Sequence, residues 1–352
     1  MSNMRQKTSV RGTMASPFAD GAVVGCGSLP HRDSAAAAAF AISEFGIATI
    51  PSLPGRSVAE TMLGQATVTL PGLGIDSSGF VAVDDRNAPG VASGDVAGGA
   101  LLDTDGFAGF SAFLDLAGKI RLDGAAVKWQ FVGPVTLGVA LERAGLDRPA
   151  AFELASASVR SSLIELSDAV TTVLPNSPQM VVLDEPWLGE LMSPGFPIPP
   201  DEAIDRMSTA MASLPGTTLT GIHCCAPCDV ATLLASGPGV ISVPVSPDLL
   251  EWAGYLTRFV DDGGIVAWGV VPTGGPIRSQ SDQPWRELSD LWCGLVQRGC
   301  DPVQLRRRSL VSPQCGLASH SVSVARGIAR LTGEVGKRVK DQSSATRFAL
   351  GA

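Results

Sequence analysis

Short apolar runs rich in β-branched residues alternate with longer amphipathic stretches through most of this 352-residue chain. This alternation is typical of parallel strands joined by helices, because a parallel sheet is covered on both faces and its strands read as continuous apolar runs. Eight runs qualify as strands, and eight parallel strands are the number that closes a (βα)8 barrel. The runs are AVVGC (22–26), IATIPSL (47–53), VKWQFVG (127–133), MVVLDEP (180–186), TLTGIHC (218–224), GVISVPV (239–245), IVAWGVV (265–271) and SLVSP (309–313).

Helical patterns fill the gaps between these runs, for example at 201–214, 246–262 and 321–335. The first begins with an Asp suited to an N-cap, and the second begins with Ser-Pro. We therefore predict an α/β fold consisting of a single (βα)8 TIM barrel. A doubly wound open sheet is the alternative, but GCGS at 25–28 lacks the third glycine of the phosphate-binding fingerprint that usually opens such a sheet.

The domain organisation follows from where the alternation starts and stops. We expect one catalytic domain over residues 21–336, a polar N-terminal tail over 1–20 and a C-terminal tail over 337–352. Residues 54–125 form a long insertion between the second and third strands. Because this insertion is too long for a simple connection and contains a Gly-rich, acidic stretch, it is a candidate lid or loop over the barrel mouth.

Composition excludes several classes of protein. Hydrophobic residues make up 45% of the chain, which favours a sizeable core over disorder. The formal net charge is −8 and no basic stripe is present, so nucleic acid is not an expected partner. No apolar run reaches the length of roughly 20 residues that a membrane-spanning helix needs, and the first residues lack the apolar centre of a signal peptide. We expect a cytoplasmic protein without a membrane partner.

A His-Cys-Cys run provides the clearest candidate for chemistry. His223 and Cys225 are two residues apart at a predicted strand end, so in extended chain their side chains share a face, and Cys315 follows the last predicted strand. Three such ligands with one replaceable position are typical of catalytic zinc. Cysteines that are merely buried, with a core histidine, are the simpler alternative. A second alternative is that Cys225 and Cys228 of CAPC form a redox pair or half of a zinc knuckle.

Other polar residues also fall at predicted strand ends, where the active groups of a TIM barrel lie. Asp184 and Glu185 are candidates for acid–base work or for binding an ammonium group, with helix capping as the alternative. Ser28, in a Gly-Ser turn, is a candidate for holding a carboxylate, although serine in such turns usually satisfies local backbone. Trp129 is a candidate wall of the substrate pocket or a core residue.

Five motifs together resemble cobalamin-independent methionine synthase. They are GCGSLP, FVGPVTL, VVLDEPWL, GIHCCAPCDVATLL and VSPQCGLA, and they occur in the order found in the C-terminal catalytic barrel of that family. The resemblance covers nearly all of the chain, and the chain is similar to the short, single-barrel actinobacterial members of the family. Uroporphyrinogen decarboxylase shares the barrel, but its Arg-rich opening is not seen in GCGSLPHRD.

The resemblance implies a function and a set of roles. His223, Cys225 and Cys315 would bind zinc, Ser28 would contact the carboxylate of homocysteine, and Asp184 would hold its amino group. Zinc would present the substrate as a thiolate that attacks a methyl group, giving methionine. The methyl donor would be a folate or a corrinoid protein.

Three departures from the family pattern separate this chain from the long synthases. Pro244 stands where the family has a fourth, acidic zinc ligand, and Asp248 is the nearest acid. Val270 or its neighbour replaces a histidine thought to protonate the folate leaving group. The N-terminal barrel of the long enzyme is also absent from this chain. These losses leave open an alternative function, in which a thiol- or corrinoid-binding barrel of the same superfamily acts on another thiol or without turnover.

Overall fold

The computed structural model describes residues 17–18, 20–83, 100–277 and 280–349. Its centre is a sheet of eight parallel strands in the order β1-β10-β9-β8-β7-β6-β5-β2. All eight predicted strands are confirmed. They are β1 (Ala22–Val23), β2 (Ala48–Thr49), β5 (Val127–Val132), β6 (Gln179–Asp184), β7 (Leu219–His223), β8 (Val240–Pro244), β9 (Ile265–Val271) and β10 (Ser309–Pro313).

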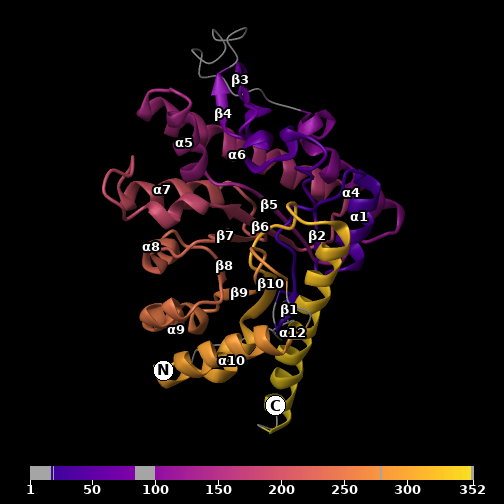
Figure 1. Cartoon of the computed structure of the whole chain (residues 1–352), viewed down its shortest axis with the longest axis vertical. Helices are drawn as coiled ribbons and strands as arrows, with labels where there is room; N and C mark the ends of the chain where they lie inside the picture. The colour runs from indigo at the N-terminus through magenta and orange to yellow at the C-terminus, as the bar shows by residue number, and fades with distance from the viewer. Residues whose placement is uncertain (1–16, 19, 84–99, 278–279, 350–352) are drawn as a thin grey trace, which may run out of the picture.

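The sheet is curled, and its helices lie on the outside (Figure 1). Two isolated parallel bridges, Val24 to Ile47 and Ser28 to Ser52, join the chain that follows β1 to the chain around β2. These two strands are the edges of the sheet, so the bridges link its first and last members. The eight parallel strands of the predicted barrel are therefore present. Where β1 meets β2, two isolated bridges take the place of a continuous ladder of backbone hydrogen bonds.

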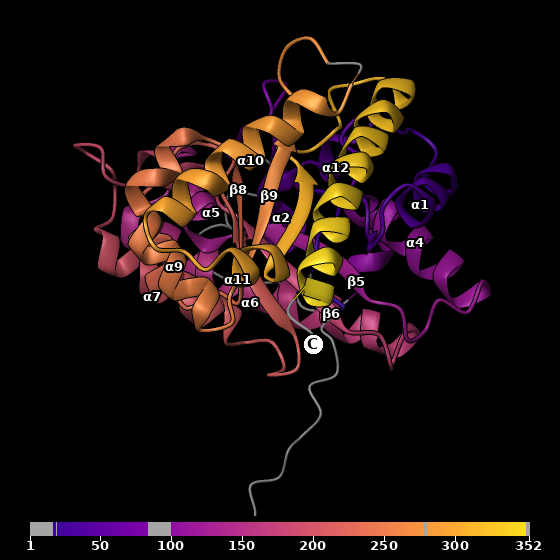
Figure 2. The same ribbon diagram turned by 90° about the horizontal axis from the view of Figure 1, so that it is seen from below.

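Helices separate consecutive strands and cover the outer face of the sheet (Figures 1 and 2). Among the described helices, none is both long enough and apolar enough to cross a membrane. The helices are α1 (Ser34–Ser43), α2 (Met62–Thr67), α4 (Ala108–Lys119), α5 (Pro134–Arg143), α6 (Arg148–Val173), α7 (Pro200–Met211), α8 (Val230–Ala235), α9 (Ala253–Asp261), α10 (Asp282–Gln297), α11 (Pro302–Arg307) and α12 (Val322–Ala349). Five short 3-10 helices are also described: η1 (Val58–Glu60), η2 (Leu101–Asp103), η3 (Asp105–Phe107), η4 (Pro186–Glu190) and η5 (Pro247–Trp252).

Three helix details differ from or refine the sequence prediction. The expected Asp cap of α7 is wrong, because the helix starts at Pro200 and its N-cap, Pro199, makes no side-chain hydrogen bond. The Ser-Pro start is confirmed, since Ser246 accepts from the backbone N–H of Asp248 at the beginning of η5. Helix α12 continues to Ala349, so most of the expected C-terminal tail is helical.

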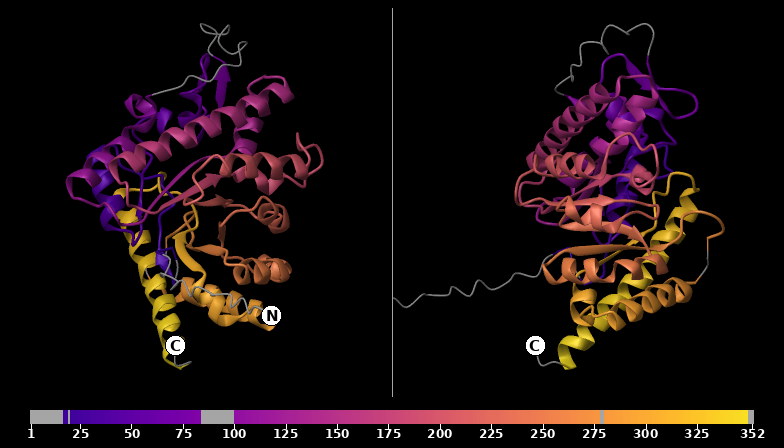
Figure 3. Two further views of the ribbon diagram at one scale, coloured as in Figure 1. Left: turned by 180° about the vertical axis from the view of Figure 1, so that it is seen from behind. Right: turned by 90° about the vertical axis from the view of Figure 1, so that its left-hand side faces the viewer.

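The insertion between β2 and β5 has structure of its own. It contains α2 and an antiparallel hairpin of β3 (Leu73–Ile75) and β4 (Val81–Val83). The hairpin lies at the outer edge of the molecule, beyond α6 (Figures 1 and 3). Most of the Gly-rich acidic stretch, at 84–99, falls outside the described residues.

Strand alternation separates two apolar clusters. The larger one lies between the sheet and the helices and includes Trp129, Leu183 and Trp268. The smaller one fills the space inside the curled sheet and includes Met180 and Val182 of β6, which alternate with the outward residues of that strand. Polar side chains follow these inward apolar residues toward the carboxyl ends of the strands, and it is there that the candidate site forms.

Candidate metal centre at the carboxyl ends of the strands

Three neighbouring strands bring polar residues to the same level. Asp184 of β6 is the register partner of His223 on β7, and His223 is the partner of Ser242 on β8. Residues opposite one another in adjacent strands point to the same face of a sheet. The three side chains therefore form one polar layer inside the curled sheet, above the apolar residues of the interior.

His223 is held in a fixed orientation within this layer. Its Nδ1 lies 2.9 Å from the hydroxyl oxygen of Ser242. The opposite ring nitrogen, Nε2, is buried and has no hydrogen-bond partner among the described residues. Because buried ring nitrogens are normally satisfied, an unpartnered Nε2 beside two thiols fits the role of a metal ligand.

Cys225 and Cys315 complete a group of three ligands. The ligand atoms of His223, Cys225 and Cys315 all lie within 4.8 Å of one another, and in the described part of the chain no other His, Cys, Asp or Glu residues form such a group of three or more. Cys225 follows β7 by two residues and Cys315 follows β10 by two residues. A set of one imidazole and two thiols is a donor set that zinc favours. The three predicted ligands are thus brought together.

Charges around the group affect each ligand differently. A side-chain hydrogen bond with Cys315 lowers the pKa of Cys225, and the same bond raises the pKa of Cys315 to about 12. Burial lowers the pKa of His223, but interactions with Cys315 and Asp184 outweigh it, so its pKa lies above the ordinary value. The two sulfurs therefore interact directly, and a cation between them would favour the thiolate form of both.

The cysteines of the HCCAPC segment interact in other pairs than the Cys225–Cys228 pair of the CAPC hypothesis. Cys228 shares a side-chain hydrogen bond with Cys224, whereas Cys225 interacts with Cys315. All of these thiols are free. The geometry therefore groups Cys225 with the candidate metal ligands and does not favour a redox pair with Cys228.

The three ligands open on a cavity of about 430 Å³, which we call the mouth cavity. Asp184 and Ser28, both predicted to contact substrate, line it as well, so the ends of β1, β6, β7 and β10 all contribute to this space. Part of the insertion forms another wall. The lining residues are Cys26, Ser28, Ser52, Pro54, Thr61, Met62, Gln65, Gln130, Phe131, Val132, Asp184, Pro186, His223, Cys225, Cys315, Gly316, Ala318 and Ser319.

Asp184 combines burial with neighbouring positive groups. Burial raises the pKa of its carboxyl group, while His223 and Lys128 act in the opposite direction. A cation bound beside it would favour the charged form further. Asp184 is therefore a buried carboxyl group on the wall of the mouth cavity, and its ionisation depends on the groups around it.

Glu185 does not take the acid–base role that we considered for it. Its carboxylate accepts from the backbone N–H groups of Val135 (2.9 Å) and Thr136 (2.7 Å), in the first turn of α5. It is fully buried and does not line the mouth cavity. The capping alternative expected Glu185 to cap the helix that begins at Pro186, but its side chain makes no cap bond to η4 and instead satisfies free N–H groups at the start of α5.

Trp129 is also not a wall of the cavity. It is fully buried, it packs edge-on against Phe110 of α4 at 6.0 Å between ring centroids, and its Nε1 donates to Gln179 Oε1 at 2.9 Å. The reason is the alternation of β5, which turns Trp129 toward the helices and its neighbours Lys128 and Gln130 inward. The assignment of Trp129 to substrate binding is therefore wrong.

Lys128 was overlooked in the sequence and is the least expected residue of the interior. It is only 4% exposed, and its Nζ donates to the backbone oxygen of Cys26 at 2.8 Å and to Gln130 Oε1. Burial lowers the pKa of its ammonium group, and the nearby Asp184 raises it. The signal that could have revealed it is a lysine inside an otherwise apolar run, VKWQFVG, since buried lysines are rare without partners.

A second cavity, the side cavity, reaches the candidate ligand group at Cys225 from another direction. Its volume is about 620 Å³, and Cys225 lines both it and the mouth cavity. Pro244 lies in its wall, so the end of β8 offers no carboxylate there. Asp248, the nearest acid in the sequence, is exposed and accepts from the Ser246 hydroxyl at 3.0 Å. It is not part of the ligand group.

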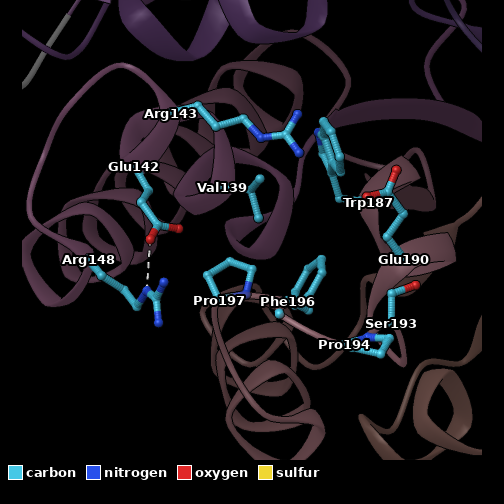
Figure 4. Close-up of a pocket in the computed structure, with 11 residues that line it drawn as sticks. Val139, Glu142, Arg143, Arg148, Trp187, Glu190, Ser193, Pro194, Phe196 and Pro197 are labelled. Carbon is cyan, nitrogen blue, oxygen red and sulfur yellow. Dashed lines mark hydrogen bonds and ion pairs between the residues drawn. The ribbon is translucent and has the colours of Figure 1, made fainter.

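A third, smaller cavity of about 220 Å³ lies between α5 and the segment after η4 (Figure 4). The guanidinium group of Arg143 lies over the Trp187 ring, 3.7 Å from its centroid. Arg148 forms an ion pair with Glu142 at 2.7 Å on the opposite side. Trp187 therefore belongs to this outer cavity and not to the mouth cavity.

Comparisons with known proteins identify the fold. No protein-family model matches the chain, and no curated protein sequence matches it. A methyltransferase from Methanosarcina mazei is 14% identical, over 89% of this chain and 94% of that chain, with a TM-score of 0.53. A candidate vitamin-B12-independent methionine synthase from Listeria monocytogenes is 13% identical, over 65% and 69% of the two chains, with a TM-score of 0.44. The chain thus shares the fold of the Methanosarcina enzyme.

Proposed function

We propose that this protein is a zinc-dependent methyltransferase that transfers a methyl group to a thiol, and that the thiol is homocysteine, which becomes methionine. The observation that carries the proposal is the opening of the His223, Cys225 and Cys315 group on the same cavity as Asp184 and Ser28. Zinc bound by the three ligands would lower the pKa of the substrate thiol and keep it as a thiolate at neutral pH.

The chain's own residues then orient the amino acid. The Asp184 carboxylate would pair with the amino group, and the Ser28 hydroxyl would donate to the substrate carboxylate. Both groups lie on the lining of the mouth cavity. Holding both ends of the amino acid would fix the position of its thiol relative to the metal and raise the effective concentration of the nucleophile.

The methyl donor would be a folate or a corrinoid protein, reaching the thiol in the cytoplasm, where thiols stay reduced. The side cavity, which also borders Cys225, gives a donor a second approach to the ligand group. The fold shared with the Methanosarcina methyltransferase, over 94% of that chain, supports methyl transfer as the reaction class.

A second candidate is favoured by one specific observation. Pro244 ends β8 and Val270 is a buried outward residue of β9, so neither of these strand ends supplies the acid or the histidine of the long synthases. A barrel that binds a thiol or a corrinoid partner, acting on another thiol or without turnover, would need neither group.

Two measurements test the proposal. Metal analysis of the purified protein should give one zinc per chain, and a Cys225→Ser variant should lose it while a Cys293→Ser variant, changed at an exposed thiol of α10, keeps it. Methionine formed from homocysteine should then appear with methyltetrahydrofolate or methylcobalamin as donor. Absence of zinc from the wild type would reject the metal centre, and zinc without methyl transfer from either donor would favour the second candidate.

A further inference from the structure

This inference rests on the proposed metal function and concerns its incomplete ligand set. Zinc in proteins is usually four-coordinate, and the group of His223, Cys225 and Cys315 supplies three ligands. The end of β8, where a fourth protein ligand could stand, carries Pro244. The fourth position in the absence of substrate is therefore open to water or to a further side chain.

Cys26 is a further soft ligand that lines the mouth cavity beside the three candidate ligands. It follows β1, the neighbour of β10 in the sheet, and its Sγ donates to the backbone oxygen of Pro313 at 3.2 Å. Pro313 stands two residues before Cys315. Cys26 lines the mouth cavity together with all three ligands, and it also lines the small interior space below them together with His223. Its thiol thus lies at the boundary between these two spaces, as His223 does.

We propose that Cys26 is the fourth ligand of the metal when no thiol substrate is bound. Cys26 lies outside the group whose ligand atoms fall within 4.8 Å, so its side chain must turn away from the Pro313 carbonyl to bind. That turn costs one weak S–H donor bond. As the sulfur–metal bond forms, the thiol proton is released to solvent. An arriving substrate thiol would then take this position, and its proton would pass to Cys26 as that side chain returned to the Pro313 carbonyl.

The surroundings act on a thiolate at Cys26 in both directions. Burial raises the pKa of the free thiol to about 12, Lys128 lowers it, and Cys315 and Asp184 raise it, so a bound cation would be needed to hold this sulfur as a thiolate. One dication with three thiolates carries a net charge of −1, and a buried anion needs a nearby positive group. The Lys128 ammonium is buried and bonded to the backbone oxygen of Cys26 itself. Asp184 is the competing candidate because it lines the same cavity, but it would bind through oxygen. The number of sulfur ligands therefore separates the two.

The test counts sulfur ligands in the full-length protein without substrate. X-ray absorption of the zinc protein should show three sulfur neighbours and one nitrogen in the wild type, and two sulfurs in Cys26→Ser. The cobalt(II)-substituted protein should show thiolate-to-metal charge-transfer absorption. In Cys26→Ser this absorption should be weaker than in the wild type by the contribution of one thiolate. Cys300→Ser, a matched change at another buried cysteine, should leave both signals unchanged. Zinc affinity of Cys26→Ser should fall by at least about 10-fold.

Each outcome decides between the claims. Two sulfurs in the wild type overturn the role of Cys26 while leaving the three-ligand zinc centre intact. No bound zinc or cobalt in the wild type overturns the metal function itself and this inference with it. If Cys26→Ser fails to fold, the sulfur count of the wild type still decides the question.

Discussion

Nδ1 of His223 and the hydroxyl of Ser242 lie 2.9 Å apart across the paired strands β7 and β8. This contact assigns one ring nitrogen to the serine and turns the other toward the two thiols. Metal-binding histidines are usually oriented by such a contact on the second ring nitrogen, which fixes the tautomer. The register of two strands thereby sets the direction of one candidate metal ligand.

Removing the Ser242 hydroxyl should weaken metal binding without unfolding the protein. We expect Ser242→Ala to lower zinc affinity by roughly 10- to 100-fold, because the imidazole loses the group that orients it. Competition with a chromogenic chelator measures the affinity. Ser236→Ala is the matched control, since Ser236 is also buried but bonds only the backbone oxygen of Leu233 in α8. Equal zinc affinity in the two variants would contradict the orienting role.

Asp184→Asn should separate substrate binding from metal binding. An amide cannot pair with an ammonium group as a carboxylate does, so we expect KM for homocysteine to rise by about 10-fold or more while zinc content stays at the wild-type value. Steady-state kinetics and metal analysis of the same preparation give both numbers. Loss of zinc together with activity would instead make Asp184 a metal ligand.

Gly316 lies against Ser28 so closely that a side chain there must displace it. A Cβ on Gly316 would fall 1.9 Å from the Ser28 hydroxyl oxygen. We expect Gly316→Ala to raise KM for homocysteine with zinc retained. Gly327→Ala in α12 is the control, because nothing lies within 4 Å of its added Cβ and alanine favours a helix by about 1 kcal/mol. That control should keep the wild-type KM, and an unchanged KM in Gly316→Ala would count against Ser28.

Glu185 should give the protein a stability that falls as pH rises. Burial raises its pKa from 4.5 to about 7, so between these values the folded state binds more protons than the unfolded state. The contribution of Glu185 is fully present below pH 4.5 and is lost as pH rises through about 7, at up to about 1.4 kcal/mol per pH unit. Denaturant unfolding at several pH values should show this slope in the wild type and a weaker slope in Glu185→Gln. If the stability of the wild type, relative to that of Glu185→Gln, rose with pH over this range, the predicted role of Glu185 would be contradicted.

The strands and the grouping of the three candidate metal ligands could be predicted from the sequence because both follow local patterns. The apolar runs marked all eight strands, and the two-residue spacing of His223 and Cys225 put them on one face. Cys315 was found because strand ends meet at one edge of a parallel sheet.

The errors concerned side-chain direction and distant partners, which no local pattern contains. Trp129 and Lys128 are adjacent, and only the direction of β5 decides which of them faces inward. Glu185 accepts from α5, a helix fifty residues earlier in the chain, so its capping role depends on tertiary contact. The continuation of α12 past residue 336 was missed because its polar sequence resembles an exposed tail.

The join between β1 and β2 should open more easily than the rest of the sheet, because only two isolated bridges span it. Between its two bridges, the Gly25 N–H donates to the Thr49 side chain, so the ladder is interrupted there. The amides of Leu29 and Ser52, which bond across this join beside Ser28, should therefore exchange with deuterium faster than those of β7 and β8. Saturating homocysteine should slow the exchange of these two amides. Their exchange rate would then report substrate binding at this join even in the absence of methyl transfer.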